Sequence, residues 1–448
     1  MSKEKKRVII VGAAGRDFHN FNVFFRNNPE YEVVCFTAAQ LPDVIAGRMY
    51  PPELAGPQYP NGIPIYKEEQ LPELIEKYNV DYVVFSYSDV SHHYVMERAA
   101  IAASKGASYI LLGPKHTMLK SNKPVIAIGA VRTGAGKSTV SRKVARILAE
   151  RGLKVVAVRH PMPYGDLRKQ IVQRFASYDD LDKYDVTFEE REEYEHYIDN
   201  GFVVYAGVDY EKILKEAEKE ADVIIWDGGN NDYPFYVPDL FIVVADALRP
   251  GHELTYWPGS VNIRMADVVI INKVVEGDMK SALTVMENIR KVNKKALILY
   301  GASVLRVDNP ADIEGKRVLV VEDGPTVTHG EMPFGAGYVA AIMYGAKEIV
   351  DPRKWVKPGT DLADAYEKYK HMGKVLPTLG YSDREKKEVE EVINASDADV
   401  VVSGTPIDLS RVLKVNKPIV RVWYELEEFG EKKLEEIIDR FLQEKGLK

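Results

Sequence analysis

A short run of small residues and glycines ends in a lysine and two hydroxyl side chains. An apolar stretch, residues 125–130, precedes the run, and a helical pattern over residues 140–150 follows it. Backbone N–H groups of such a loop and of the helix start face an anion. Lysine then reaches the β and γ phosphates, and the next hydroxyl holds Mg²⁺. We therefore predict that a nucleoside triphosphate is bound with Mg²⁺ by Thr133, Gly134, Ala135, Gly136, Lys137, Ser138 and Thr139.

This loop departs from the common phosphate-loop pattern at its start. Val131 stands where that pattern has its first glycine, and Arg132 lies five residues before Lys137. The run resembles the MinD and nitrogenase-iron-protein branch of P-loop proteins, which has a signature lysine at the position of Arg132. That resemblance makes Arg132 a candidate second phosphate contact, within one chain or across a homodimer. The alternative is a solvated arginine.

A second motif follows the apolar run 221–226. Asp227 comes directly after this predicted strand and is followed by two glycines, as in a Walker B element. We expect Asp227 to join Ser138 in the Mg²⁺ shell. A GTPase switch would have glycine at position 230, where this chain has Asn230.

The base-reading motif is also incomplete. Asn272 and Lys273 follow the predicted strand 268–271, but Val275 replaces the aspartate that reads guanine. Asn272 can still accept the amino group of adenine. We expect ATP, and keep GTP as the alternative.

Two further loops carry polar side chains after predicted strands. Arg159, His160 and Asp166 follow the second strand of the P-loop region, beside the γ-phosphate position. His160 or Asp166 is a candidate base, and Arg159 a candidate holder of an anionic substrate. A structural turn is the alternative.

The other polar loop follows the strand 317–321. Glu322 and Asp323 are candidate metal or substrate ligands, and His329 is a candidate general acid or base. Gly335 opens a helix and is a candidate second anion cradle.

These motifs must be positioned by alternating strands and helices. The pattern predicts an α/β protein with a central P-loop NTPase domain over 120–345. A Rossmann-like α/β domain over 1–119 precedes it, and a smaller α/β domain over 346–448 follows. The first turn has Gly12 and Gly15 but lacks the third glycine of a dinucleotide fingerprint. The acidic run 179–200 is expected to be a solvated helix face, or else to place one glutamate near the nucleotide or metal.

Composition excludes several classes of protein. The net charge of −7 with mixed signs gives no reason to expect nucleic acid or an anionic membrane as a partner. No signal peptide and no apolar run of membrane-spanning length is found. Cys35, the single cysteine, rules out an internal disulfide. We expect a cytoplasmic protein, and the many Glu, Lys and Tyr residues suggest a thermophile.

The residues 132–138 and 321–330 together resemble cyclic 2,3-diphosphoglycerate synthetases and related archaeal and bacterial proteins labelled predicted GTPases. The resemblance is strongest over 120–345. It implies ATP- and Mg²⁺-driven phosphoryl transfer to a small anionic, phosphorylated glycerate-like acceptor. Lys137, Arg132, Asp227, His160, His329 and Asp323 would be catalytic, and Arg159, Asp166, Glu322 and Gly335 would hold substrate. The alternatives are a regulatory or chaperone-like NTPase switch and a nucleotide sensor without catalysis.

Overall fold

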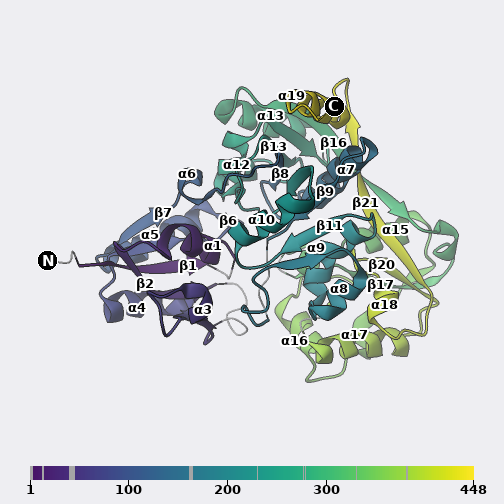
Figure 1. Ribbon diagram of the computed structural model, residues 1–448. Coiled ribbons are helices and arrows are strands. Elements are labelled where there is room, and N and C mark those ends of the chain that lie inside the picture. Colours follow the sequence, from purple (N-terminus) through teal and green to yellow (C-terminus); the bar gives the residue numbers. More distant parts are fainter. Residues whose placement is uncertain are drawn as a thin grey trace. The chain divides into compact units, whose positions relative to one another are not determined.

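The structure is a computed structural model that describes residues 4–12, 15–39, 46–160, 165–229, 231–275, 277, 279–328, 330–379 and 382–447. The chain packs into two compact units (Figure 1). The first unit is made of Met1–Arg174, Val203–Gly301 and Glu428–Lys448, and the second of Phe175–Phe202 and Ala302–Glu427. Three domains with boundaries near residues 120 and 345 were expected. The first unit contains the N-terminal region, the greater part of the P-loop region and the last helix.

The N-terminal domain of the first unit is a six-stranded sheet in the order β3-β4-β2-β1-β5-β7. All neighbours in it are parallel except β3 and β4. Its strands are β1 (Lys6–Gly12), β2 (Tyr31–Ala38), β3 (Met49–Tyr50), β4 (Ile63–Lys67), β5 (Tyr82–Phe85) and β7 (Ser108–Leu111). Its helices are α1 (Arg16–Asn20), the continuing π-helix η1 (Phe21–Phe25), α3 (Pro52–Ala55), the 3₁₀ turn η2 (Glu68–Gln70), α4 (Leu71–Tyr78), α5 (His92–Ser104) and α6 (Pro114–Thr117).

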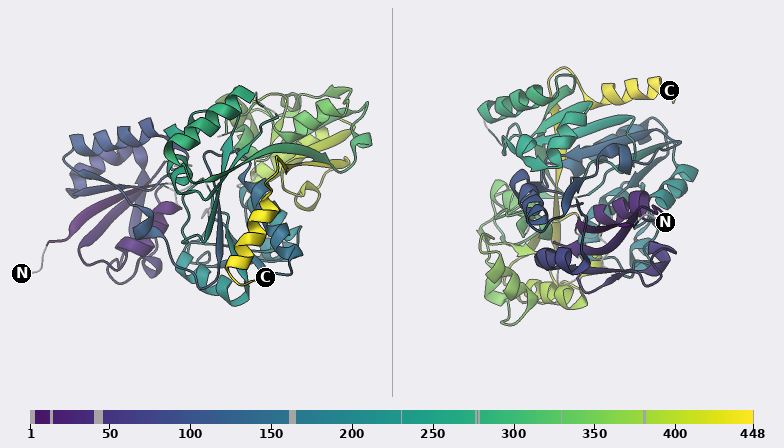
Figure 2. Two further views of the ribbon diagram at one scale, coloured as in Figure 1. Left: turned by 90° about the horizontal axis from the view of Figure 1, so that it is seen from above. Right: turned by 90° about the vertical axis from the view of Figure 1, so that its left-hand side faces the viewer.

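Both faces of this sheet are covered, which explains why its central strand is an unbroken apolar run. Val8 and Ile10 of β1 pack with aromatic residues of α1 and η1. Ile9 and Val11 point to the other face and pack against α4 and α5. Figure 2 shows helices on either side of these strands.

The P-loop domain of the first unit is a parallel sheet in the order β11-β9-β12-β8-β13-β15-β16. Its strands are β8 (Val125–Ala130), β9 (Val155–Val158), β11 (Val203–Ala206), β12 (Val223–Trp226), β13 (Leu240–Asp246), β15 (Val268–Asn272) and β16 (Leu297–Val307), the last of which runs on into the second unit. Its helices are α7 (Lys137–Glu150), α10 (Tyr210–Glu220), α11 (His252–Thr255), α12 (Gly259–Met265), α13 (Met279–Val292) and α19 (Leu434–Glu444). The short strands are β10 (Gln173–Phe175), β6 (Val90–Ser91) and β14 (Tyr256–Trp257).

Two contacts tie other parts of the chain to this sheet. Strand β6 pairs antiparallel with β14 and thereby joins the N-terminal domain to the P-loop domain. The last helix, α19, buries its apolar face, and its Asp439 pairs with Arg151 at 3.0 Å beyond the end of α7.

The strand order places the predicted motifs together. β8, which leads into the phosphate loop, lies between β12 and β13, and β13 pairs with β15. Because these strands are parallel, their carboxyl ends meet at one edge of the sheet, where open α/β sheets bind ligands. Asp227 at the end of β12 and Asn272 at the end of β15 therefore lie at the same edge as Lys137.

The strands of the second unit continue the same 13-stranded sheet in the order β21-β20-β17-β18, with β19 beside β17, and these pairs are parallel. Its strands are β17 (Arg317–Glu322), β18 (Glu348–Ile349), β19 (Leu376–Pro377), β20 (Val400–Gly404) and β21 (Ile419–Phe429). Its helices are α8 (Tyr178–Lys183), α9 (Phe188–Ile198), η3 (Pro310–Asp312), α14 (Gly324–Val327), α15 (Ala336–Met343), η4 (Pro352–Trp355), α16 (Asp361–Lys368), α17 (Asp383–Ala395) and α18 (Leu409–Val412).

The acidic run was expected to be a solvated face, and this expectation is wrong. Helix α9 buries most of its charged side chains, including Glu190, Glu192 and Glu195. Glu195 pairs with Arg191 at 3.1 Å, and Glu192 accepts a hydrogen bond from Thr378 at 2.7 Å. Charge runs are usually solvated, but here each acid finds a partner inside the unit.

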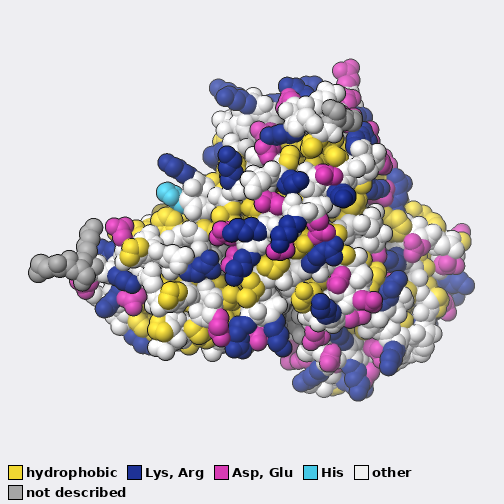
Figure 3. Space-filling model, in the orientation of Figure 1, with side chains coloured by type: hydrophobic (Ala, Val, Ile, Leu, Met, Phe, Trp, Pro, Cys, Tyr) yellow, Lys and Arg dark blue, Asp and Glu magenta, His cyan; other side chains and the backbone are white. Residues whose placement is uncertain are grey.

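In the described part of the chain, no helix is both long and apolar enough to span a bilayer. Figure 3 shows side chains of both charge signs interspersed over the visible face.

Burial of Glu190 predicts a pH dependence of stability. Burial raises the pKa of this carboxyl from its ordinary 4.5 to about 7, against the opposing hydrogen bond from the Thr187 N–H. A folded pKa above the unfolded one stabilises the fold at low pH, and this contribution is lost as the pH rises from 4.5 through 7. Glu190→Gln keeps the capping box but removes the titrating carboxyl. We therefore expect the change in the free energy of unfolding between low and high pH to shrink by on the order of 3 kcal/mol.

Urea unfolding at pH 4.5, 6 and 8 tests this expectation. Glu216→Gln on the exposed face of α10 is the control and should leave the profile unchanged. Parallel profiles for Glu190→Gln and the unaltered protein would contradict it.

Candidate nucleotide site

The phosphate loop lies between the end of β8 and the start of α7. Gly136, directly before Lys137, has φ +105°, a left-handed conformation that glycine adopts without strain. A Cβ there would also lie 2.2 Å from Nδ2 of Asn272. The position therefore requires glycine for two separate reasons.

Three side chains from neighbouring strand ends hold the carbonyl groups of the loop. They donate hydrogen bonds of 2.6 to 2.9 Å to consecutive loop residues. The pairs are Arg249 with Thr133, Lys273 with Gly134, and Asn272 with Ala135. These bonds fix the conformation of the loop through its carbonyl groups, and the N–H groups of such a loop are the ones that bind an anion.

Asp246 at the end of β13 binds two of these donors. Its buried carboxylate contacts Arg249 at 2.8 Å and Lys273 at 3.2 Å. Lys273 has φ +61°, so its backbone is bent to reach the loop. Asn272 was expected to read the base; in this structure its amide donates to the loop instead.

Asp227 is fully buried and contacts three side chains. Lys137 Nζ lies 2.9 Å from its Oδ1, which also accepts a hydrogen bond from Ser141, while Arg159 binds Oδ2. Burial lowers the pKa of Lys137 to about 8, although the charge of Asp227 opposes the shift. The predicted phosphate lysine and the predicted Walker B carboxylate thus meet directly. Arg159, expected on a substrate, neutralises Asp227 here.

Ser138 and Thr139 lie in the first turn of α7. Ser138 is half-buried, and the Thr139 hydroxyl donates to the Gly136 carbonyl at 2.7 Å. The described residues contain no group of three His, Cys, Asp or Glu side chains that could hold a metal alone. One hydroxyl and one carboxylate are nevertheless the usual protein ligands of Mg²⁺ on a bound nucleotide, whose phosphates supply the other oxygens.

Arg132 is held by the N-terminal domain. Its Nε donates to Asp89 Oδ1 at 2.7 Å, and its guanidinium stacks 3.8 Å from the ring centroid of Tyr256. Asp89 Oδ2 also accepts the N–H of Thr133 at 3.3 Å. A carboxylate of the chain therefore contacts two groups that a phosphate would use.

His160 forms a buried polar chain with the N-terminal domain. Its Nε2 lies 3.1 Å from Asp232 Oδ2, and Asp232 Oδ1 accepts a hydrogen bond from Arg16 at 2.9 Å. All three residues are less than 10% exposed. A Cβ on Gly15 would lie 1.9 Å from the imidazole, so only glycine allows this approach. Although burial raises the pKa of Asp232, Arg16 and His160 hold it below its ordinary value.

The remaining predicted site residues are Asp166, Glu322, Asp323, His329 and Gly335. Asp166 is exposed and forms a local pair with Arg168 at 3.0 Å. Glu322, Asp323 and Gly335 belong to the second unit, and His329 lies outside the described residues. Asp323 precedes α14 and accepts a hydrogen bond from the Thr326 hydroxyl at 2.6 Å.

The expected anion cradle at Gly335 is filled by the chain itself, so this interpretation is corrected. Glu322 accepts the N–H groups of Gly335 at 3.0 Å, Gly337 at 3.3 Å and Tyr338 at 2.8 Å. The carboxylate of Glu322 thereby provides the negative charge that stabilises the N-terminus of α15. Burial raises the pKa of Glu322 to about 7 despite these bonds. Glu322 is a helix cap in this structure.

Sequence reasoning missed Arg16, Asp89 and Asp232. Asp232 is the last residue of the polar run that begins at Asp227. Arg16 directly follows the glycine-containing turn after β1. Both positions follow strands, which was the available signal. Asp89 also follows a strand, β5, but its partner Arg132 is 43 residues away in sequence.

Comparison with known proteins agrees with a synthetase family. No protein-family model matches the chain. A curated protein of Thermococcus kodakarensis, the arginine synthetase ArcE, is 63% identical over 439 residues, which are 98% of this chain and 97% of that protein. The chain belongs to the arginine synthetase ArcE family. The name of this relative does not support the resemblance to cyclic 2,3-diphosphoglycerate synthetases.

Solved structures resemble the ArcE-family chain only weakly. LpxK of Aquifex aeolicus in complex with ATP is 15% identical, covers 83% of this chain and 99% of its own, and has a TM-score of 0.45. HypB of Archaeoglobus fulgidus is 17% identical, covers 40% and 79%, and has a TM-score of 0.23. Neither likeness carries an argument about function.

Asp89→Asn tests whether this carboxylate competes with phosphate. The change removes a negative charge from Arg132 and the Thr133 N–H, so we expect triphosphate to bind about fivefold more tightly. Titration calorimetry with ATP and GTP measures it. Glu97→Gln, an exposed acid on α5, is the charge-matched control. Weaker binding in Asp89→Asn would instead make Asp89 a support of the site.

Gly15→Ala tests the approach of the N-terminal turn to His160. The added methyl group must displace the imidazole from Asp232. We expect turnover to fall at least tenfold with a change in melting temperature of only a few degrees. Gly113→Ala is the control, because a Cβ at Gly113 meets open space and the residue does not have a positive φ. Unchanged turnover would contradict a role for His160.

Proposed function

We propose that this chain is a nucleoside-triphosphate-driven synthetase that forms arginine. The carrying observation is the contact of Lys137 with Asp227 at the end of a parallel strand, in a chain 63% identical to an arginine synthetase. A P-loop lysine and a strand-end carboxylate are the parts that phosphoryl transfer needs. The name of the relative supplies the product class.

In this proposal the loop amides and Lys137 hold the triphosphate, and Ser138 and Asp227 bind Mg²⁺. Lys137 moves from Asp227 to the phosphates, whose charge restores its full protonation. Arg159 remains on the other oxygen of Asp227 and keeps the buried carboxylate neutralised. The bound Mg²⁺ supplies charge stabilisation for the transferring phosphoryl group.

The chemistry follows from the product. A guanidinium differs from a ureido group by one nitrogen in place of one oxygen, so the ureido amino acid citrulline is the simplest precursor. Its carbonyl oxygen takes the γ-phosphoryl group and the nucleoside diphosphate leaves. Ammonia then adds to the carbon, and the C–O bond breaks to release phosphate. His160, oriented by Asp232, is our candidate to accept the proton that the incoming nitrogen loses.

Arg132 acts within its own chain in this proposal, because Asp89 of the same chain holds it beside the loop. A homodimer is therefore not required for this contact. The competing function is an NTPase switch without a small-molecule acceptor, which predicts slow hydrolysis and no new carbon–nitrogen bond. A phosphorylated glycerate remains a control acceptor.

Lys137→Ala tests the nucleotide site. We expect loss of nucleotide turnover by at least a hundredfold, because a positioned cation on the transferred group is removed. Phosphorus NMR and arginine analysis are followed with ATP or GTP, citrulline and ammonia. Lys215→Ala on the exposed face of α10 is the control.

Arginine formed by the unaltered protein and by Lys215→Ala but not by Lys137→Ala would support the proposal. Nucleotide hydrolysis without arginine, whatever the acceptor, would favour the switch. A phosphorylated glycerate product would overturn arginine as the product.

A further inference from the structure

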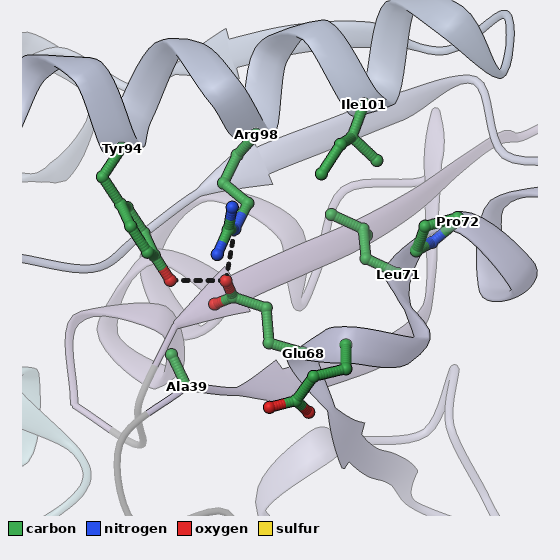
Figure 4. A pocket seen from close by; sticks show the side chains of 8 residues that line it. Ala39, Glu68, Leu71, Pro72, Tyr94, Arg98 and Ile101 are labelled. Carbon is green, nitrogen blue, oxygen red and sulfur yellow. Dashed lines mark hydrogen bonds and ion pairs between the residues drawn. The ribbon is translucent and has the colours of Figure 1, made fainter.

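The N-terminal domain contains a cavity of about 190 Å³ that the nucleotide site does not use (Figure 4). It lies where β4 ends and α4 begins, with α5 as the facing wall. This is the carboxyl edge of the domain's parallel sheet, where α/β sheets bind ligands. Its volume is below the roughly 300 Å³ at which pockets for drug-sized molecules begin, so its ligand is smaller than a nucleotide.

One wall of the cavity is charged. Glu68, directly after β4, is 6% exposed, and its Oε1 accepts hydrogen bonds from the Tyr94 hydroxyl and from Nε of Arg98. Figure 4 shows Tyr94 and Arg98 extending from α5 toward Glu68. The Arg98 guanidinium stacks 4.0 Å from the ring centroid of Tyr94, which fixes its plane. A carboxylate and a guanidinium therefore lie side by side in fixed positions.

The other oxygen of Glu68 points to a ligand. Among the residues that the structure describes, Oε2 is buried and has no hydrogen-bond partner. The Tyr109 hydroxyl is likewise buried and has no hydrogen-bond partner among the described residues. Burial raises the pKa of Tyr109, and the charge of Glu68 raises it further. A buried carboxylate oxygen without a donor is costly, so this side of the cavity calls for an N–H group.

The opposite wall is apolar. Leu71 and Pro72 open α4, and Ile101 lies one helical turn beyond Arg98 on α5. A ligand that fits must donate to a carboxylate, accept from a guanidinium and place a short aliphatic chain on this wall. A metal ion is disfavoured, because the described residues supply no third His, Cys, Asp or Glu ligand.

We propose that this cavity binds a free α-amino acid. Its ammonium group donates to Glu68 Oε2, its carboxylate accepts from Arg98, and its aliphatic stem lies on Leu71, Pro72 and Ile101. The pairing of Glu68 with Arg98 does not depend on the proposed function. The choice of arginine, ornithine and citrulline as probes rests on the proposed function. Helix α5 begins at His92, directly after β6 and Asp89, so the amino-acid site and the holder of Arg132 belong to one continuous segment.

Calorimetry on the full, nucleotide-free chain tests this site with L-arginine, L-ornithine and L-citrulline, one at a time. Agmatine, which lacks the carboxylate of arginine, is the matched probe. We expect at least one amino acid to bind, and agmatine to bind at least tenfold more weakly than arginine. Glu68→Gln and Arg98→Gln should each weaken binding at least tenfold, and Glu76→Gln, an exposed acid of α4, should not.

Ile101→Trp fills the cavity without changing its charges, and it guards against misfolding of the charge variants. It should abolish the same binding event while the melting temperature stays within a few degrees. Lys137→Ala should still bind the amino acid, because Lys137 belongs to the nucleotide site. This variant therefore distinguishes failure of the proposed reaction from failure of the amino-acid site. If binding is the same in Glu68→Gln, Arg98→Gln and Ile101→Trp, if agmatine equals arginine, or if no amino acid binds, the proposal is overturned.

Discussion

The nucleotide site depends on one buried carboxylate. Asp227 has no exposed surface, and an ionised carboxylate in such a place must be paired or it destabilises the fold. Lys137 approaches it from the phosphate loop and Arg159 from the end of β9. Three neighbouring strand ends are thereby brought to a common point. In the proposed function, Lys137 is the member of this cluster that moves to a phosphate.

A second layer of charges holds the loop itself. Asp246 fixes Arg249 and Lys273, and these with Asn272 engage the loop carbonyls. The incomplete guanine-reading motif is explained by this arrangement, because Asn272 and Lys273 act on the loop even without the aspartate that reads a base.

The N-terminal domain takes part in the site. Asp89 contacts Arg132 and the Thr133 N–H, and Arg16 contacts Asp232, the partner of His160. Both contacts follow strands of the N-terminal sheet, so the same edge that contains the Glu68 cavity also faces the phosphate loop. The segment from Asp89 to Arg98 runs from the contact with Arg132 to the charged wall of the cavity.

The sequence by itself determined the phosphate loop, the strand-end position of Asp227 and the α/β class, because these are local patterns of glycine, apolar runs and following helices. It could not determine which charges are buried. From sequence, the acids of α9 were expected to face solvent and Glu322 to bind a metal or substrate. In the structure, Glu192 of α9 accepts a hydrogen bond from Thr378, and Glu322 accepts N–H groups at the start of α15. Arg16, Asp89 and Asp232 acquired roles only through partners 43 to 216 residues away. Pairing of charges across such distances is set by tertiary packing, since a side chain's desolvation depends on neighbours that no local pattern encodes.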